Sequence, residues 1–156
     1  MSELAVGDTA PEIELPTDGD GSFKLSEESD KPVVLYFYPK DDTPGCTLEA
    51  IAFSGLDSEF GGAGSIVVGI SPNDPASHDK FKTKHKLSVL LASDTEKTVA
   101  EAYGVWVMKK RYGREYMGVE RSTFLVSSDG KIARIWKKVK VEGHAEEVLQ
   151  AVKDLA

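Results

Sequence analysis

The chain has 156 residues, of which 40% are hydrophobic and 29% are charged, and its formal net charge is −7. These values are typical of a soluble globular protein with one core, so residues 1–156 are predicted to form a single domain. The negative net charge argues against nucleic acid or an anionic membrane surface as a partner.

The first third of the chain predicts a hairpin, a buried strand and a helix. Residues 10–25 are predicted to form two short strands joined by the Asp-Gly-Asp-Gly turn at 18–21. The apolar run 33–38, VVLYFY, ends at Pro39 and predicts a central strand buried on both faces. Residues 44–60 predict a helix. Its apolar side would carry four residues at four-residue spacing: Leu48, Ala52, Leu56 and Phe60.

The middle of the chain alternates between strands and helices. Residues 65–71 predict a buried strand, and 71–86 predict an Asn/Asp/Pro opening followed by a short helix. Residues 87–94 predict a third buried strand, and 95–105 predict a helix. Residues 106–118, WVMKKRYGREYMG, are predicted to be a polar and aromatic loop.

The last third of the chain predicts a strand pair and a helix. Residues 121–126 and 131–139 predict strands joined by a Ser-Ser-Asp-Gly turn. Residues 142–156 predict an amphipathic helix, because four apolar residues recur at helical spacing: Val148, Leu149, Val152 and Leu155. This order predicts an α/β fold in which a central mixed β-sheet is flanked by helices and preceded by an N-terminal β-hairpin. A thioredoxin-like layout is compatible with it.

The N-terminal residues lack the positively charged start and apolar run of a secretory signal peptide. No apolar run approaches the length needed to span a membrane. Cys46 is the only cysteine, so no internal disulfide can form, and a reducing cytoplasm is the expected compartment.

The position of Cys46 indicates a reactive thiol. Thr43 is a good N-cap and Pro44 is favoured at the first helical position, which puts Cys46 in the first helical turn. The free backbone N–H groups and the helix dipole stabilise a thiolate there. Gly45 removes side-chain bulk beside the sulfur, so small polar or anionic groups can approach the amides. The alternative is an inert cysteine packed as a small hydrophobe.

Three segments resemble one family. The segment PKDDTPGCT at 39–47 is similar to the active-site segment of the peroxiredoxins, in which Pro, three residues, Thr, two residues and Cys follow one another. The longer stretch from Tyr36 resembles the bacterioferritin comigratory protein, or PrxQ, subfamily. RSTFLV at 121–126 and GHAEEVL at 143–149 resemble that family's second motif and C-terminal helix. The likeness runs from about Gly7 to Leu155.

The resemblance implies a thiol-dependent peroxidase with a thioredoxin-like fold. Cys46 would be the peroxidatic nucleophile that reduces hydrogen peroxide and organic hydroperoxides and becomes a sulfenic acid. Arg121 would reach the sulfur, favour the thiolate and bind the peroxide oxygens. Thr43 would point its hydroxyl at the sulfur or the peroxide besides capping the helix. Pro39 and Gly45 would shape the substrate site. No metal, haem or flavin is required.

One position departs from the pattern of the subfamily. Many members carry a resolving cysteine five residues after the first, where this chain has Ile51. The resemblance therefore implies a one-cysteine peroxiredoxin whose sulfenic acid is reduced by an external thiol, such as thioredoxin, glutaredoxin or glutathione. A Cys46–Cys46 disulfide between two chains stays open. The expected state is a monomer or weak homodimer.

Several residues and functions stay open at this point. Glu49 lies one turn beyond Cys46 and is expected either to pair with a cation near the site or to be a solvated helix residue. His78, His85 and His144 are expected to be surface or capping residues, because they lack neighbours at ligand spacing. Two other functions for the chain are a non-enzymatic redox sensor or holdase-like binder that uses Cys46, and an inert scaffold.

Overall fold

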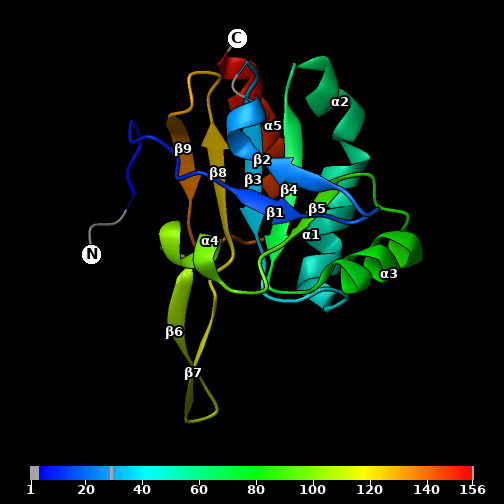
Figure 1. The fold of residues 1–156 in the computed structure, drawn as a ribbon, viewed down its shortest axis with the longest axis vertical. Coiled ribbons are helices and arrows are strands. Elements are labelled where there is room, and N and C mark those ends of the chain that lie inside the picture. Colours follow the sequence, from blue (N-terminus) through cyan, green and yellow to red (C-terminus); the bar gives the residue numbers. More distant parts are fainter. Residues whose placement is uncertain (1–3, 29, 156) are drawn as a thin grey trace.

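The computed structural model describes residues 4–28 and 30–155 and has a mixed five-stranded sheet at its centre (Figure 1). The order across this sheet is β5-β4-β3-β8-β9. Strands β3, β4 and β5 are parallel, whereas β8 is antiparallel to both β3 and β9. The bounds are β3 (Val33–Phe37), β4 (Ile66–Ser71), β5 (Leu90–Ser93), β8 (Ser122–Val126) and β9 (Ile132–Trp136). The predicted mixed central sheet is confirmed.

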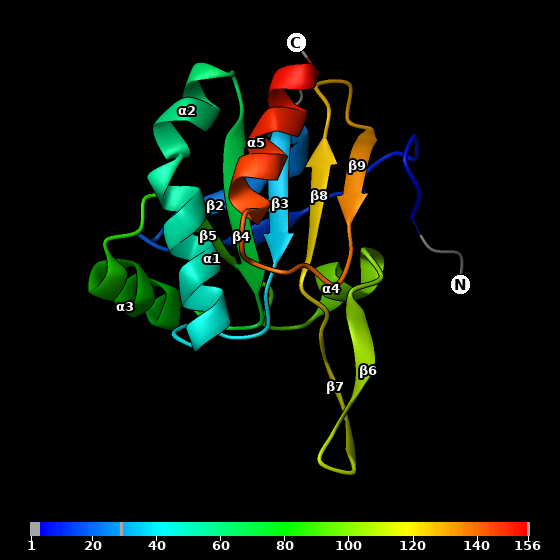
Figure 2. The same cartoon turned by 180° about the vertical axis from the view of Figure 1, so that it is seen from behind.

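Helices cover one face of the sheet, and the N-terminal segment covers much of the other. Figure 2 shows α1 (Pro44–Gly55), α2 (Asp57–Gly62) and α5 (His144–Asp154) in front of the strands. The predicted N-terminal hairpin, β1 (Glu14–Pro16) and β2 (Ser22–Lys24), lies across the opposite face, followed by a short 3₁₀ helix, η1 (Leu25–Glu28). Helix α4 (Thr98–Ala102) is shorter than predicted. The predicted short helix after the Asn/Asp/Pro opening is α3 (Pro75–His85), and the Asp74 side chain caps its N-terminus.

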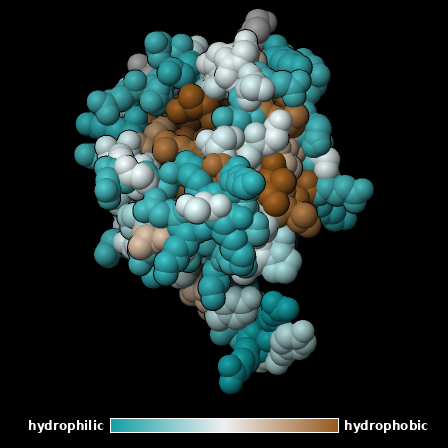
Figure 3. All heavy atoms as spheres, turned by 90° about the vertical axis from the view of Figure 1, so that its right-hand side faces the viewer, coloured by the Kyte–Doolittle hydropathy of each residue, from teal (hydrophilic) through white to brown (hydrophobic). Residues whose placement is uncertain are grey.

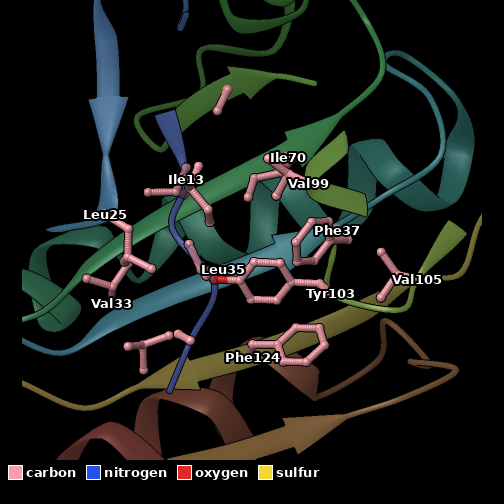
Figure 4. Packing of buried hydrophobic residues seen from close by; sticks show 14 of the residues in the cluster. Ile13, Leu25, Val33, Leu35, Phe37, Ile70, Val99, Tyr103, Val105 and Phe124 are labelled. Atoms are coloured by element: carbon pink, nitrogen blue, oxygen red, sulfur yellow. The ribbon is translucent and has the colours of Figure 1, made fainter. Parts of the chain in front are cut away.

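The side chains of β3 belong to two separate hydrophobic cores, because successive side chains of a strand point to opposite faces. All five residues of β3 are buried, as predicted. One core is shown in Figure 4 and contains Ile13, Val33, Leu35, Phe37, Tyr103 and Phe124, among others. The other lies under α1, α3 and α5 and includes Val34, Tyr36, Phe53, Phe81 and Val148. The central strand is therefore held from both sides, and its carboxyl end is a fixed point for the residues that follow.

The predicted helix 44–60 is wrong in two respects. It breaks at Leu56, which has φ −105° and ψ 5°, so that α1 and α2 are separate. Its predicted apolar stripe is buried only in part, since Phe60 is buried and Ala52 and Leu56 pack against the core, but Leu48 is 61% exposed. The buried side of α1 carries Cys46, Glu49, Ala50 and Phe53. The reason is packing: the Phe53 ring stacks on Tyr36 with 4.7 Å between centroids, and this contact sets the rotation of the helix.

The predicted loop 106–118 is also wrong, because these residues form an antiparallel hairpin. Strands β6 (Trp106–Arg111) and β7 (Arg114–Val119) pair with each other and project from the body of the molecule (Figures 1 and 2). Tyr112 and Gly113 form the tip with φ of 53° and 76°, as a two-residue hairpin turn requires. The charged side chains hid the strand pattern, because both faces of this hairpin are largely exposed.

The surface on the side of α2 and α3 is mostly hydrophilic, with apolar atoms in small separate patches (Figure 3). Among the described residues, no helix has both the length and the apolar character needed to cross a membrane.

Candidate active site

Cys46 and Arg121 meet at the carboxyl end of β3. Cys46 lies in the first turn of α1, which follows β3, and it is 2% exposed. Arg121 directly precedes β8, whose first residue, Ser122, pairs with the last residue of β3, Phe37. This register brings residues that are 75 positions apart into contact, and Nη2 of Arg121 donates a hydrogen bond to the Cys46 sulfur at 3.2 Å.

The other side of the Arg121 guanidinium is bound by a buried carboxyl group. Nη1 of Arg121 donates to Oε1 of Glu49 at 2.7 Å, and the Glu49 side chain is 1% exposed. Of the two alternatives for Glu49, pairing with a cation is therefore correct and the solvated position is wrong. Burial raises the pKa of Glu49 to about 7, although Arg121 opposes the shift. Burial disfavours the charge of Arg121, but Glu49 and Cys46 raise its pKa above the ordinary value.

Thr43 occupies the N-cap position, but its side chain does not cap the helix. Its carbonyl oxygen accepts the first helical hydrogen bond, from the N–H of Thr47 at 2.8 Å. Its hydroxyl instead donates to the carbonyl oxygen of Lys40 at 2.8 Å, so the predicted side-chain cap is wrong. A hydroxyl that donates to a carbonyl keeps its lone pairs available as acceptors.

Gly45 and Pro39 surround the same helix start. A Cβ atom on Gly45 would lie 3.1 Å from Nη2 of Arg121, so the glycine makes room for the guanidinium beside the sulfur. Pro39 is half-buried and opens the loop that leads from β3 to Thr43. The structure thus brings Cys46, Arg121 and Gly45 into one cluster, with Thr43 at the start of the same helix.

Two of the three histidines, expected to be surface or capping residues, are buried. His78 is fully buried, and its Nδ1 lies 2.7 Å from Oδ2 of Asp41. His144 opens α5 as expected, but its ring is buried against the Thr123 hydroxyl at 2.8 Å, and burial lowers its pKa. A signal for His78 was present in the sequence, since it lies three residues before the apolar Phe81 and shares its helix face. Within the described residues, no group of three or more His, Cys, Asp or Glu side chains could hold a metal ion.

This arrangement is suited to nucleophilic chemistry at sulfur. The Arg121 cation lies at hydrogen-bonding distance from the sulfur, and the sulfur lies at the N-terminus of α1, where the first backbone N–H groups lack acceptors within the helix. The same guanidinium offers N–H groups to oxygen atoms that approach the sulfur. An inert, hydrophobically packed cysteine would not have such a charged partner.

Comparisons with known proteins agree with this chemistry. The family described as AhpC/TSA matches residues 6–135. Peroxiredoxin Bcp of Bacillus subtilis is 46% identical over 153 residues, which cover 98% of both chains. A PrxQ mutant structure from Xylella fastidiosa aligns with a TM-score of 0.93 at 36% identity and covers 99% of each chain.

A second solved relative differs in its thiols. Peroxiredoxin Q of Xanthomonas campestris aligns with a TM-score of 0.87 at 41% identity, covering 91% of this chain and 90% of that one. It was also solved as serine mutants of two different cysteines, whereas this chain has one cysteine. The neighbours share the thioredoxin-like fold predicted from the sequence.

Proposed function

The chain belongs to the AhpC/TSA family and is a peroxiredoxin, a thiol-dependent peroxidase of the Bcp/PrxQ type. From this premise we propose that Cys46 is its peroxidatic nucleophile. We also propose that residues 1–156 form a single domain. The observation that most supports this role is the hydrogen bond from Arg121 to the Cys46 sulfur at 3.2 Å. Arg121 and Thr43 are the other catalytic residues in this proposal.

In the proposed reaction the Cys46 thiolate attacks the terminal oxygen of a hydroperoxide. The S–O bond forms as the O–O bond breaks, and the electron pair leaves on the other oxygen, which is protonated to water or an alcohol. Arg121 donates to the peroxide oxygens and to the charge that develops on them. The Thr43 hydroxyl, whose proton is donated to Lys40, accepts a hydrogen bond from the peroxide O–H.

Two further residues serve the substrate site in this proposal. Gly45 leaves the space that Arg121 occupies beside the sulfur, since a Cβ there would lie 3.1 Å from Nη2. Pro39, half-buried at the start of the loop, shields the thiolate from water.

The return to the thiol requires a second molecule, because the sequence holds no other cysteine. An external thiol attacks the Cys46 sulfenic acid with loss of water, and a second thiol then reduces the mixed disulfide. Thioredoxin, glutaredoxin and glutathione are the candidate reductants for this step. We place the protein in the cytoplasm, as a monomer or weak homodimer that removes hydrogen peroxide and organic hydroperoxides.

The proposal is tested by the intact mass of the protein after one equivalent of hydrogen peroxide in the presence of dimedone, which traps sulfenic acid. We expect a rapid adduct on the parent chain and none on Cys46→Ser. A small-molecule thiol treated with the same peroxide is the control for active oxidant. If that thiol is oxidised while Cys46 of the parent chain stays a free thiol, the peroxidatic role is refuted. Turnover with an added thiol separates a peroxidase from a redox sensor or holdase-like binder, and no contact among the described residues favours either alternative.

A further inference from the structure

A buried aspartate in the active-site loop is the centre of a hydrogen-bond cluster outside the catalytic residues. Asp41 lies between β3 and α1, and its side chain is 4% exposed. The Tyr38 hydroxyl donates to its Oδ1 at 2.6 Å. The Ser77 hydroxyl donates to its Oδ2 at 2.8 Å, and Nδ1 of His78 lies 2.7 Å from the same oxygen. One side chain directly after β3 and two from α3 thus hold one carboxyl group of the loop.

His78 connects this carboxyl group to the sheet. Its Nε2 lies 3.0 Å from the carbonyl oxygen of Ala92, and a carbonyl oxygen can only accept, so Nε2 carries a proton. Both side chains are buried, with 0% of His78 and 4% of Asp41 exposed. Asp41 and His78 therefore act as one unit anchored to β5.

The next residue of the loop is held by the same helix from outside. Asp42 has a positive φ of 59°, which is strained for a residue with a side chain. Its carboxylate accepts from Nζ of Lys84 at 2.7 Å and lies 2.8 Å from Nε2 of His85. Helix α3 thus binds two consecutive aspartates, one buried and one exposed.

The contacts of Asp41 affect the Thr43 hydroxyl through the carbonyl group of Lys40. Lys40 directly precedes Asp41, and its carbonyl oxygen accepts the Thr43 hydroxyl at 2.8 Å. The backbone N–H of Asp41, in the same peptide unit as that carbonyl, donates to Oδ1 of Asn73 at 2.9 Å. Fixing Asp41 therefore fixes the direction of the Lys40 carbonyl and, with it, the lone pairs of Thr43.

We propose that His78 and Asp41 are positioning residues of the peroxide site, which act through the Lys40 carbonyl on the Thr43 hydroxyl. This inference rests on the proposed function, because it requires that Thr43 receives the peroxide O–H. A displacement of the hydroxyl slows the attack on peroxide, while the thiolate itself keeps its Arg121 partner.

The test compares two reactions of Cys46 in His78→Phe, which keeps a ring in place but removes both nitrogen atoms. We expect the rate with hydrogen peroxide to fall about tenfold, and the rate of alkylation by iodoacetamide, which does not use Thr43, to change less than about twofold. Lys82→Met is the matched control on α3, because it removes a bridge to Asp18 and leaves the loop contacts intact. A merely structural role would expose the buried thiol and accelerate alkylation instead.

Two further variants make the result decisive. Ser77→Ala removes a single hydrogen-bond donor to Asp41 at a half-exposed position, so the variant is expected to fold even if His78→Phe does not. We expect it to lower the rate with hydrogen peroxide about threefold. His78→Phe combined with Thr43→Val should be no slower than Thr43→Val alone, because both act on the same hydroxyl. Unchanged peroxide rates in His78→Phe and Ser77→Ala, or independent effects in the double variant, would overturn the inference. Failure of the parent chain to form the dimedone adduct would instead overturn the proposed function.

Discussion

The buried Glu49 makes the stability of this protein depend on pH in a direction that can be calculated. Its pKa is raised from 4.5 to about 7 by burial, with Arg121 opposing the shift. The folded chain therefore keeps a proton that the unfolded chain has already lost between these two values, so stability falls as pH rises through this window and stays low above it. Because one pKa unit corresponds to about 1.4 kcal/mol, the free energy of unfolding should lose about 3 kcal/mol between pH 4.5 and pH 7 through this group alone.

Glu49→Gln tests this reasoning, since glutamine has nearly the same shape but does not titrate. Urea unfolding should be measured for both forms in a Cys46→Ser background, which excludes thiol chemistry. Below pH 4.5 the two should be similar, and above pH 7 the glutamine form should have gained about 3 kcal/mol relative to the parent. Glu59→Gln, at an exposed position on α2, is the matched control. If the difference in the free energy of unfolding between the parent and Glu49→Gln stays constant over the whole pH range, the calculation is refuted.

Three other substitutions test contacts of the same region. Arg121→Met should lower the rate with hydrogen peroxide by about 10²- to 10³-fold, measured by stopped-flow, because it removes the cation at the sulfur; a loss below tenfold would contradict this role. Gly45→Ala should lower the rate with hydrogen peroxide about tenfold with little loss of stability, because its Cβ would lie 3.1 Å from Nη2 of Arg121 and displace the guanidinium. A crystal structure of the variant in which Arg121 has not moved would contradict this explanation. Tyr36→Phe should raise the free energy of unfolding, measured in urea, by about 1 kcal/mol, because the buried Tyr36 hydroxyl has no hydrogen-bond partner among the described residues; a destabilised variant would contradict this.

The sequence predicted the elements whose signals are local. The apolar run of β3 ended by Pro39, and the Thr43–Pro44 helix start, specify the strand, the loop and the turn that carries Cys46 without reference to the rest of the chain. The rotation of α1 was missed, because it depends on the Phe53–Tyr36 contact between two elements. The β6–β7 hairpin was missed for the opposite reason: it is stabilised by its own ladder and turn, and it lacks the apolar face by which strands are recognised.

The candidate site divides in the same way. Cys46, Thr43 and Arg121 were predicted from motifs, and the structure places Nη2 of Arg121 3.2 Å from the Cys46 sulfur and Thr43 at the N-cap of the same helix. The partners of Asp41 do not follow from motifs, because the carboxyl group, the imidazole and the Ala92 carbonyl come from three separate elements. Their convergence is a property of the folded sheet, in which β4 places β5 and α3 beside the loop.

The single thiol also sets how the protein behaves when its supply of reductant runs low. A chain with two cysteines can store its oxidised state in an internal disulfide, whereas the reaction proposed for this chain requires a second molecule to reduce the single cysteine. Its throughput under steady peroxide is then governed by the concentration of that second molecule rather than by any motion of its own. In the proposed reaction, a Cys46 sulfenic acid that meets a second peroxide before it is reduced passes to the sulfinic acid, so the over-oxidised fraction of the protein would record how long peroxide exceeded the supply of reductant.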